Sequence, residues 1–537
     1  MADPHSTARD AIVTATHVRP DGAPAPARFA LELRPGQDPA KQAERVRAAL
    51  AGLDELDVTV EPLSELDPDV LVATFPGRVL ADDPTAAFVA AHELRAEFDL
   101  AAAEPDLPTA FFPEKEEAGG AGRESVGGFP PGCFAPEEPA IEADPRWALR
   151  AMRVPDAWGF SQAQQRPGRG AGVVVAQPDT GVTVHPELAG VAVAPGRDII
   201  DSDDDPTDPL TGGNEGHGTG TASVLVSPES LVMAGTAPLA RHMPIRAVES
   251  VIRITQVSVA QAIDWAVASG AHVITMSLGG IPSFSLHRAL RRAVEADVIV
   301  LAAAGNCVRT VVWPARYDDC IAVAGTNIRG EQWRGSCRGA AVDVSAPAEN
   351  VVRARIGLPA VGQGQGTSFA VAMVAGVAAL WLAHHGRAAL VAAARARGET
   401  LQTMFRRLLQ ATAQRPPGWD SSAMGAGIVD ARALLGAALD LGSGRESVEP
   451  PGAGAVETLV AEAFGADAVD ETVDWHQFGP ELATTVLQAR LAGPAERAPR
   501  TVVTAHLAAA VGNPALRARL GLPSLRDPAT VRQGETR

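Results

Sequence analysis

Three short segments of this chain carry a carboxylate, an imidazole and a hydroxyl, and each includes a glycine. In chain order they are Asp179-Thr180-Gly181, Gly216-His217-Gly218-Thr219 and Gly366-Thr367-Ser368-Phe369-Ala370. A serine hydroxyl is a useful nucleophile only when a positioned base takes its proton, and a histidine oriented by a carboxylate is such a base. The order Asp, His, Ser is one of three chain orders that build this geometry. The segments therefore predict acyl transfer on Ser368, with His217 as the base and Asp179 behind it.

A fourth segment, residues 302–306 (Ala-Ala-Ala-Gly-Asn), supplies a side-chain amide that could donate to an oxyanion. Each group also has an ordinary structural explanation when it is taken alone. Ser368 could be a helix N-cap and Asp179 a turn residue, while a Gly-Asn pair often forms a turn. The presence of all four segments in one chain favours catalysis over these alternatives.

Together the four segments resemble the subtilisin family of serine peptidases. The resemblance covers roughly residues 145–440. It implies a catalytic triad of Asp179, His217 and Ser368, with the Asn306 amide in the oxyanion hole. It also implies that peptide bonds are hydrolysed through an acyl-enzyme.

The resemblance further places the two walls of a primary specificity pocket. One wall is Ser277, Leu278, Gly279 and Gly280, and the other is Ala303, Ala304 and Gly305. An extended substrate would pair with such edges by β-augmentation. The stretch from Asn306 to Trp313-Pro314 is short for the family, so Val312 is expected near the pocket floor, where it would limit the depth.

An acidic run, residues 198–208, lies shortly before His217. Calcium takes six to eight oxygen ligands, which alternating carboxylates on a loop can supply. The resemblance implies calcium ligands at Asp198, Asp201, Asp203, Asp205 and Thr207. The alternative is a solvated acidic loop without metal. No organic cofactor is expected.

Between Trp147 and residue 326, apolar runs of strand length alternate with helical windows. The runs include residues 173–175, 272–276, 298–301 and 321–324, and the windows include 259–268 and 286–295. This alternation predicts an α/β fold with a doubly wound, mostly parallel sheet of the subtilisin type. Asp179 and Asn306 each follow a predicted strand, where ligand sites of such sheets lie.

Residues 28–112 have the pattern βαββαβ, which resembles the inhibitory propeptide domain that precedes subtilisin-like catalytic domains. The alternative is a ferredoxin-like packing domain without an inhibitory role. The Gly/Pro-rich segment that follows is an expected site of proteolytic cutting. The expected organisation is a propeptide-like α+β domain (1–112), a linker (113–144), the catalytic domain (145–440), a second linker (441–454) and a helical C-terminal region of unknown role (455–537).

The net charge of −18 argues against nucleic acid and against an anionic membrane as partners. The first residues show no secretory signal pattern, which predicts a cytoplasmic protein with reduced thiols. The four cysteines are Cys133, Cys307, Cys320 and Cys337. A Cys307–Cys320 disulfide is expected only if the protein meets an oxidising compartment. Cys307 as a nucleophile is a minor alternative, because Ser368 has the better context.

These observations predict a serine endopeptidase that acts on protein or peptide substrates, with its own N-terminal domain as a possible inhibitor. The alternative is a catalytically silent or self-inhibited binding module with the same fold. An α/β-hydrolase esterase is disfavoured, since it requires Gly-x-Ser-x-Gly and the order Ser, Asp, His.

Overall fold

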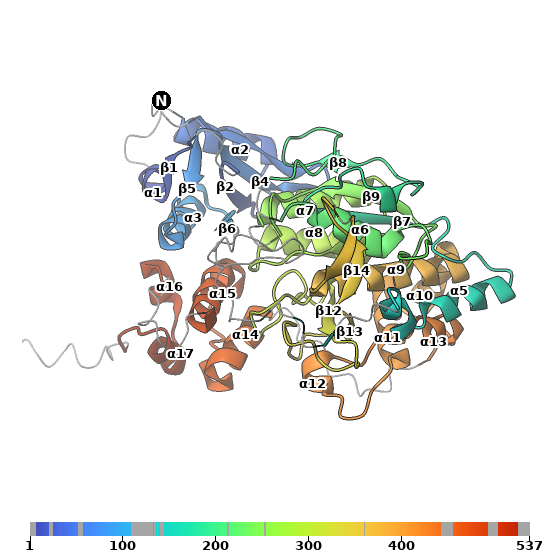
Figure 1. Ribbon diagram of the computed structural model, residues 1–537. Coiled ribbons are helices and arrows are strands. Elements are labelled where there is room, and N and C mark those ends of the chain that lie inside the picture. Colours follow the sequence, from blue (N-terminus) through green and yellow to red (C-terminus); the bar gives the residue numbers. More distant parts are fainter. Residues whose placement is uncertain are drawn as a thin grey trace, which may run out of the picture.

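The structure is a computed structural model. It describes residues 7–20, 25–51, 57–108, 133, 136, 138–139, 144–211, 214–251, 254–358, 360–441, 455–491 and 503–524. A small N-terminal α+β unit lies beside a large central α/β unit, and the C-terminal helices lie against both (Figure 1).

The N-terminal unit is built on a four-stranded antiparallel sheet with the order β3-β4-β2-β6. Its elements are α1 (Thr7–Ala15), β1 (Thr16–Val18), β2 (Ala27–Glu32), α2 (Pro39–Leu50), β3 (Thr59–Ser64), β4 (Asp67–Phe75), β5 (Arg78–Leu80), α3 (Pro84–Phe98) and β6 (Ala102–Pro105). Both longer helices begin in the same way, with an aspartate N-cap followed by proline: Asp38 caps α2 and Asp83 caps α3. Strand β6 is an edge strand of this sheet.

The central unit contains a seven-stranded sheet with the order β13-β12-β11-β10-β7-β9-β8, in which every pair is parallel. Its strands are β7 (Val174–Asp179), β8 (Arg197–Asp198), β9 (Arg241–Arg246), β10 (Val273–Met276), β11 (Ile299–Ala303), β12 (Ile321–Thr326) and β13 (Val344–Pro347). Almost every residue of β10, β11 and β12 is buried, as expected for strands covered on both faces. The predicted doubly wound parallel sheet is confirmed.

Two pairs of helices cover this sheet. Helices α6 (His217–Val226) and α9 (Thr367–His385) pack on one face, where Val175, Ile299 and Val323 belong to the same buried cluster as α9. Helices α7 (Gln256–Ala268) and α8 (Phe284–Glu295) pack on the other face with Ile274 and Val300. Among the described residues, α9 alone is long and apolar enough to span a membrane, and its whole apolar window is buried inside the protein.

The remaining elements flank this core. Within the central unit they are α4 (Trp147–Ala151), α5 (Val154–Ala163), the 3-10 helix η1 (Pro186–Leu188), the hairpin β14 (Val351–Ala354) and β15 (Val361–Gly364), α10 (Arg387–Ala396), α11 (Leu401–Thr412), α12 (Ser421–Met424) and α13 (Ala431–Gly436). The C-terminal helices are α14 (Ala455–Phe464), η2 (Ala466–Ala468), α15 (Trp475–Leu491), α16 (Ala505–Ala510) and α17 (Pro514–Arg519).

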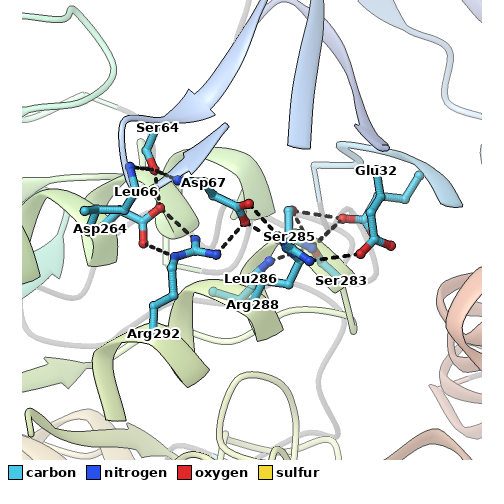
Figure 2. A network of polar contacts seen from close by, with 11 residues as sticks. Glu32, Ser64, Leu66, Asp67, Asp264, Ser283, Ser285, Leu286, Arg288 and Arg292 are labelled. Atoms are coloured by element: carbon cyan, nitrogen blue, oxygen red, sulfur yellow. Dashed lines mark hydrogen bonds and ion pairs between the residues drawn. The ribbon is translucent and has the colours of Figure 1, made fainter. Parts of the chain in front are cut away.

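The N-terminal sheet docks on helices α7 and α8 through a network of ion pairs (Figure 2). Arg288 of α8 donates to both carboxylate oxygens of Asp67, at 2.8 and 2.6 Å. Arg292 holds Asp264 of α7 in the same two-pronged way, and the Ser64 hydroxyl donates to Asp264 at 2.5 Å. Paired forks of this kind fix orientation as well as adding attraction.

Two carboxylates of the N-terminal unit also cap the helices on which it sits. Glu104 of β6 accepts from the backbone N–H of Phe284 at 2.9 Å and from the hydroxyls of Ser283 and Ser285, at the start of α8. Asp106 accepts from the backbone N–H of Val257, at the start of α7, at 3.1 Å. Each carboxylate satisfies donors that a helix N-terminus leaves unpaired.

Candidate active site

Asp179 and His217 meet at the carboxyl end of the parallel sheet. Asp179 ends β7 and His217 begins α6, and the His217 Nδ1 lies 2.8 Å from the Asp179 Oδ1. Both residues are buried. The carboxylate accepts, so Nδ1 carries a proton, and in the neutral ring Nε2 is the basic nitrogen.

The close approach of these two segments depends on a glycine and on a shared carboxylate. A methyl group at Gly218 would lie 2.1 Å from the carbonyl oxygen of Gly181, so no side chain fits there. The buried Asp208 accepts from the Thr180 hydroxyl at 2.8 Å and from the Gly216 N–H at 2.9 Å. Asp208 therefore links the turn after Asp179 to the turn before His217.

A buried network of hydrogen bonds holds the Asp179 carboxylate. Thr221 of α6 donates to the Asp179 Oδ2 at 3.2 Å, and the Gln177 amide donates to the Thr221 hydroxyl at 2.6 Å. Gln177 in turn accepts from the His242 Nε2 at 2.7 Å. Burial lowers the pKa of His242 to about 4, against an opposing attraction from Asp179. His242 is therefore neutral near pH 7.

Ser368 lies in the first turn of α9, after Gly366. Its backbone oxygen accepts from the Ser277 hydroxyl at 3.0 Å, and its own hydroxyl lies 3.5 Å from the Ser277 carbonyl oxygen. Ser277 follows β10 directly, so these contacts hold the start of α9 against the end of the central strand.

Asn306 follows β11, and its side chain is fixed by the residue before Ser368. The Asn306 Oδ1 accepts from the backbone N–H of Thr367 at 3.0 Å and from the Thr367 hydroxyl at 2.9 Å. With its oxygen held on that side, the amide group has a fixed orientation, and its N–H donors face the other way.

The two segments predicted as pocket walls are joined by Val312 and Trp313. The Val312 N–H donates to the Ala304 oxygen at 3.1 Å, and the Gly280 N–H donates to the Trp313 oxygen at 2.7 Å. A methyl group at Gly279 or at Gly305 would lie 2.6 or 2.8 Å from the Val312 Cγ2. The isopropyl group of Val312 thus lies between the walls. The other wall residues, Ser277, Leu278, Ala303 and Ala304, are buried.

The cysteine predictions need correction. Cys307 forms a disulfide with Cys133, which lies 174 residues earlier, and the predicted pairing with Cys320 is not formed. This bond excludes Cys307 as a nucleophile. Cys320 and Cys337 are buried free thiols, and burial raises the pKa of both. The disulfide attaches the segment between the N-terminal and central units to the residue next to Asn306.

The acidic loop does not fit the predicted calcium site. Asp198 and Asp201 both pair with the Arg246 guanidinium, at 2.6 and 2.5 Å. Asp203 and Asp205 accept from backbone N–H groups of their own loop, and Asp205 also accepts from the Thr207 hydroxyl. Within the described ranges, no group of three or more His, Cys, Asp or Glu residues is arranged to hold a metal ion. Arg246, the last residue of β9, supplies a positive charge to this loop.

Residues 170–427 match the family described as Peptidase_S8, the subtilase family. Thermitase from Thermoactinomyces vulgaris is 35% identical over 261 residues, which are 48% of this chain and 88% of thermitase. The thermostable alkaline protease of Halalkalibacterium halodurans is 36% identical, over 45% of this chain and 67% of that protein. Subtilisin BL of Lederbergia lenta is 34% identical, over 43% of this chain and 84% of that protein.

The parallel-sheet fold and the protease relatives together identify the class of this protein: it is a hydrolase, a serine endopeptidase of the subtilisin type. The chain belongs to the subtilase family.

Several residues that shape the site were assigned no role in it from the sequence. They are Gln177, Thr221, His242, Thr367, Arg246 and Cys133. Thr367 lies within the serine segment and Thr221 lies two residues after the histidine segment, so their positions on α9 and α6 could have indicated a supporting role. Asp208 was part of the acidic run but was not separated from it.

Proposed function

We propose that this peptidase cleaves its substrates through an acyl-enzyme on Ser368, with His217 as the proton carrier. The observation that carries this proposal is the buried 2.8 Å contact between His217 and Asp179. It lies at the carboxyl ends of the parallel strands, where Ser368 and Asn306 also lie. Helix α6, which His217 begins, packs against α9, which holds Ser368, and Asn306 contacts Thr367, the residue before Ser368. A base and an amide donor are the groups that acyl transfer needs beside a serine.

In the first half of the reaction the Ser368 hydroxyl turns from the Ser277 carbonyl toward the His217 Nε2. The Oγ bonds to the substrate carbonyl carbon while Nε2 takes the hydroxyl proton. Asp179 holds the ring through Nδ1–H and stabilises the imidazolium. Collapse of the tetrahedral intermediate breaks the C–N bond, and the same proton passes from Nε2 to the leaving amine. The acyl group remains on Ser368.

In the second half a water molecule takes the place of the amine. His217 removes its proton as the water oxygen bonds to the acyl carbon, and returns the proton to Oγ as the ester bond breaks. In both halves negative charge develops on the carbonyl oxygen. The Asn306 amide, held by Thr367, donates to that oxygen together with backbone N–H groups at the start of α9.

The substrate class follows from the walls of the pocket. An extended peptide would lie along residues 277–280, with the side chain before the scissile bond entering between the two walls. Because Val312 fills the space between Gly279 and Gly305, that side chain must be small. We propose a preference for Ala or a residue of similar size at this position.

The N-terminal unit is proposed as an inhibitor of the same site. Its strand β6 docks at the starts of α7 and α8 through Glu104 and Asp106, and the chain continues from there into the predicted linker. The propeptide resemblance implies that the extended segment of residues 100–112 runs toward the catalytic cleft, and residues 109–112 of that segment lie outside the described residues. The rival function, a silent or self-inhibited binding module, is not favoured by the protease relatives.

A labelling experiment tests the assignment. The full chain and its Ser368→Ala variant are treated with a fluorophosphonate probe and, separately, with casein, and the new peptide termini are identified by mass spectrometry. We expect labelling and cleavage by the wild type alone. Cleavage retained at more than a tenth of the wild-type rate in Ser368→Ala would refute the nucleophile. Glu104→Arg should increase labelling if the N-terminal unit inhibits, and leave it unchanged if that unit only packs.

A further inference from the structure

The C-terminal helices α14–α17, in residues 455–491 and 503–524, contact the N-terminal unit through polar side chains and the catalytic domain through apolar ones. We call these helices the clasp. In Figure 1 helices α15 and α16 lie next to α3 and β6. The side chains at this boundary form three layers of contact: a strand edge, a buried polar network and a rim of ion pairs.

The strand edge is covered by one glutamine. Ala103 of β6 points its N–H and C=O away from β2, toward the open edge of the sheet. The Gln477 Oε1 accepts from that N–H at 3.0 Å, and the Gln477 Nε2 donates to that oxygen at 3.0 Å. The side chain thus supplies the donor and acceptor that an added strand would have supplied.

The buried network is centred on His92 of α3. The second Gln477 amide proton is given to the His92 Nδ1 at 3.1 Å, which leaves Nε2–H to donate to Glu481 at 2.9 Å. Glu481 is fully buried and also accepts from the Thr504 N–H at 2.6 Å. The contacts of His92 with Gln477 and Glu481 exist only when the two units are together, whereas Glu481 keeps its bond from Thr504 within the clasp. Separation would leave polar groups unpaired on both sides, which makes the fit selective.

Ion pairs surround this centre, and each joins the N-terminal unit to the clasp. Arg95 pairs with Asp474 at 2.8 Å, Glu93 with His506 at 3.3 Å, and Glu32 with His476. The N-terminal unit supplies the basic residue of the first pair and the carboxylates of the other two. The pairing with Glu32 raises the pKa of His476.

The clasp is anchored equally firmly to the catalytic domain. Arg316, which is 1% exposed in its side chain, pairs with Glu462 of α14 at 2.7 Å. Leu459 and Val460 of α14 belong to one continuous buried apolar cluster that also contains α7, α8 and Phe88 of the N-terminal unit. The clasp therefore bridges two parts of the protein whose covalent connection runs through the predicted cutting site.

We propose that the clasp is the receptor for the N-terminal unit and keeps that unit on the catalytic domain after the connecting chain has been cut. Its partner is the face formed by α3 and the β6 edge, recognised by the Gln477–Ala103 pairing and the His92–Glu481 contact. The N-terminal unit then stays attached to the mature protein through this face after cutting, and its retention is a property separate from inhibition. This role is independent of the proposed peptidase mechanism.

The test uses the full chain with Ser368→Ala, so that no self-cleavage interferes. A recognition sequence for a specific protease is inserted between Gly119 and Gly120, upstream of Cys133, so that the disulfide cannot retain the released fragment. After cutting, dissociation of a fluorescently labelled N-terminal fragment is followed by anisotropy in an excess of unlabelled fragment. We expect the fragment to stay bound and to co-elute with the rest of the chain.

Variants of the clasp show whether the N-terminal fragment is retained by the clasp or only by its docking on α7 and α8. Gln477→Leu should accelerate dissociation at least tenfold, because Ala103 loses the partners of its N–H and C=O and His92 loses the partner of its Nδ1. Thr484→Val in the same helix is the matched control, since its hydroxyl donates only within the helix, to Pro480, and it should dissociate like wild type. Circular dichroism verifies that both variants are folded.

Exchanging the charges of one ion pair gives a second test that does not depend on whether Gln477→Leu folds. Arg95 and Asp474 are partly exposed, at 28% and 43%, but Asp474 also accepts from the Gln477 N–H at 3.2 Å at the start of α15. Arg95→Asp or Asp474→Arg alone should accelerate dissociation severalfold, and the double variant should dissociate more slowly than Asp474→Arg, because the ion pair is restored while the helix cap is not. Wild-type dissociation rates in the single charge variants and in folded Gln477→Leu would overturn the proposal.

Discussion

The side-chain oxygen of Asn306 is held by both the N–H and the hydroxyl of Thr367, the residue before Ser368. The loop after β11 and the start of α9 are thereby locked together, and the Asn306 amide cannot flip without losing two hydrogen bonds. The proposed oxyanion donor is therefore oriented before any substrate arrives.

Asn306→Ala should lower kcat by roughly a hundred- to a thousandfold with little change in KM, a magnitude carried over from subtilisin itself. Asn306→Asp keeps an acceptor for Thr367 but has no donor for the oxyanion, so its kcat should fall as far as that of Asn306→Ala. Thr367→Val should lower kcat about fivefold, which is the effect of losing one hydrogen bond. Rescue by Asn306→Asp in steady-state kinetics would show that the residue only braces α9.

Val312→Ala should widen the specificity pocket. Removing two methyl groups between Gly279 and Gly305 makes room for a larger side chain, so kcat/KM for Phe relative to Ala should rise roughly tenfold. A peptide series that varies only this position measures the ratio. Val311→Ala, in the adjacent and equally buried residue, is the control. The same ratio in wild type and Val312→Ala would place the substrate side chain elsewhere.

Arg246 should make the acidic loop independent of calcium. Its removal in Arg246→Ala leaves the buried Asp198 without its charge partner, at a cost of roughly 3–5 kcal/mol in unfolding free energy. Arg197→Ala, which breaks a more exposed pair with Asp204 in the same loop, should cost at most about 1 kcal/mol. Thermal melting of the wild type should be the same with calcium and with chelator. A calcium-dependent rise that Asp201→Ala with Asp203→Ala removes would contradict this.

Docking of the N-terminal unit should depend on pH through Glu104. Burial raises its pKa to about 7 from the ordinary 4.5, although hydrogen bonds from Ser283, Phe284 and Ser285 oppose the shift. The docked form then binds the proton more tightly than the free form, so docking strengthens as the pH falls from 7 toward 4.5 and weakens as it rises through 7. Dissociation of the cut fragment measures this. The pH dependence in that window should be smaller in Glu104→Gln, and an unchanged profile there would assign it to other groups.

Thiol counting tests the disulfide. Denatured, unreduced protein should show two reactive thiols, from Cys320 and Cys337, and reduced protein should show four. Cys133→Ser should expose Cys307 as a third thiol without reductant. Disulfides persist where the environment is oxidising, so the thiol count in protein isolated without reductant also tests the cytoplasmic location that the sequence predicts. Four thiols in unreduced protein would support the sequence-based expectation instead.

The groups proposed for catalysis could be found without the structure because their geometry is local. Asp179, His217 and Ser368 each lie where a strand ends or a helix begins, and a few neighbouring glycines and hydroxyls identify such points. The alternation of strands and helices likewise indicated the parallel sheet, since buried strands need apolar runs. Strand β9 was missed because its sequence, Arg-His-Met-Pro-Ile-Arg, interrupts the apolar pattern with charge.

The amino-acid sequence by itself determined the fold class, the family resemblance and the chemistry proposed at Ser368. Only the tertiary structure decided which distant groups pair. Arg246 meets Asp198 across 48 residues, Cys133 meets Cys307 across 174, and Gln477 meets Ala103 across 374. A cation, a thiol or an amide has many possible partners along a chain, and nothing local selects one. The selection is made when the packing of sheet and helices fixes which surfaces lose water together, because each buried polar group must then find its partner there.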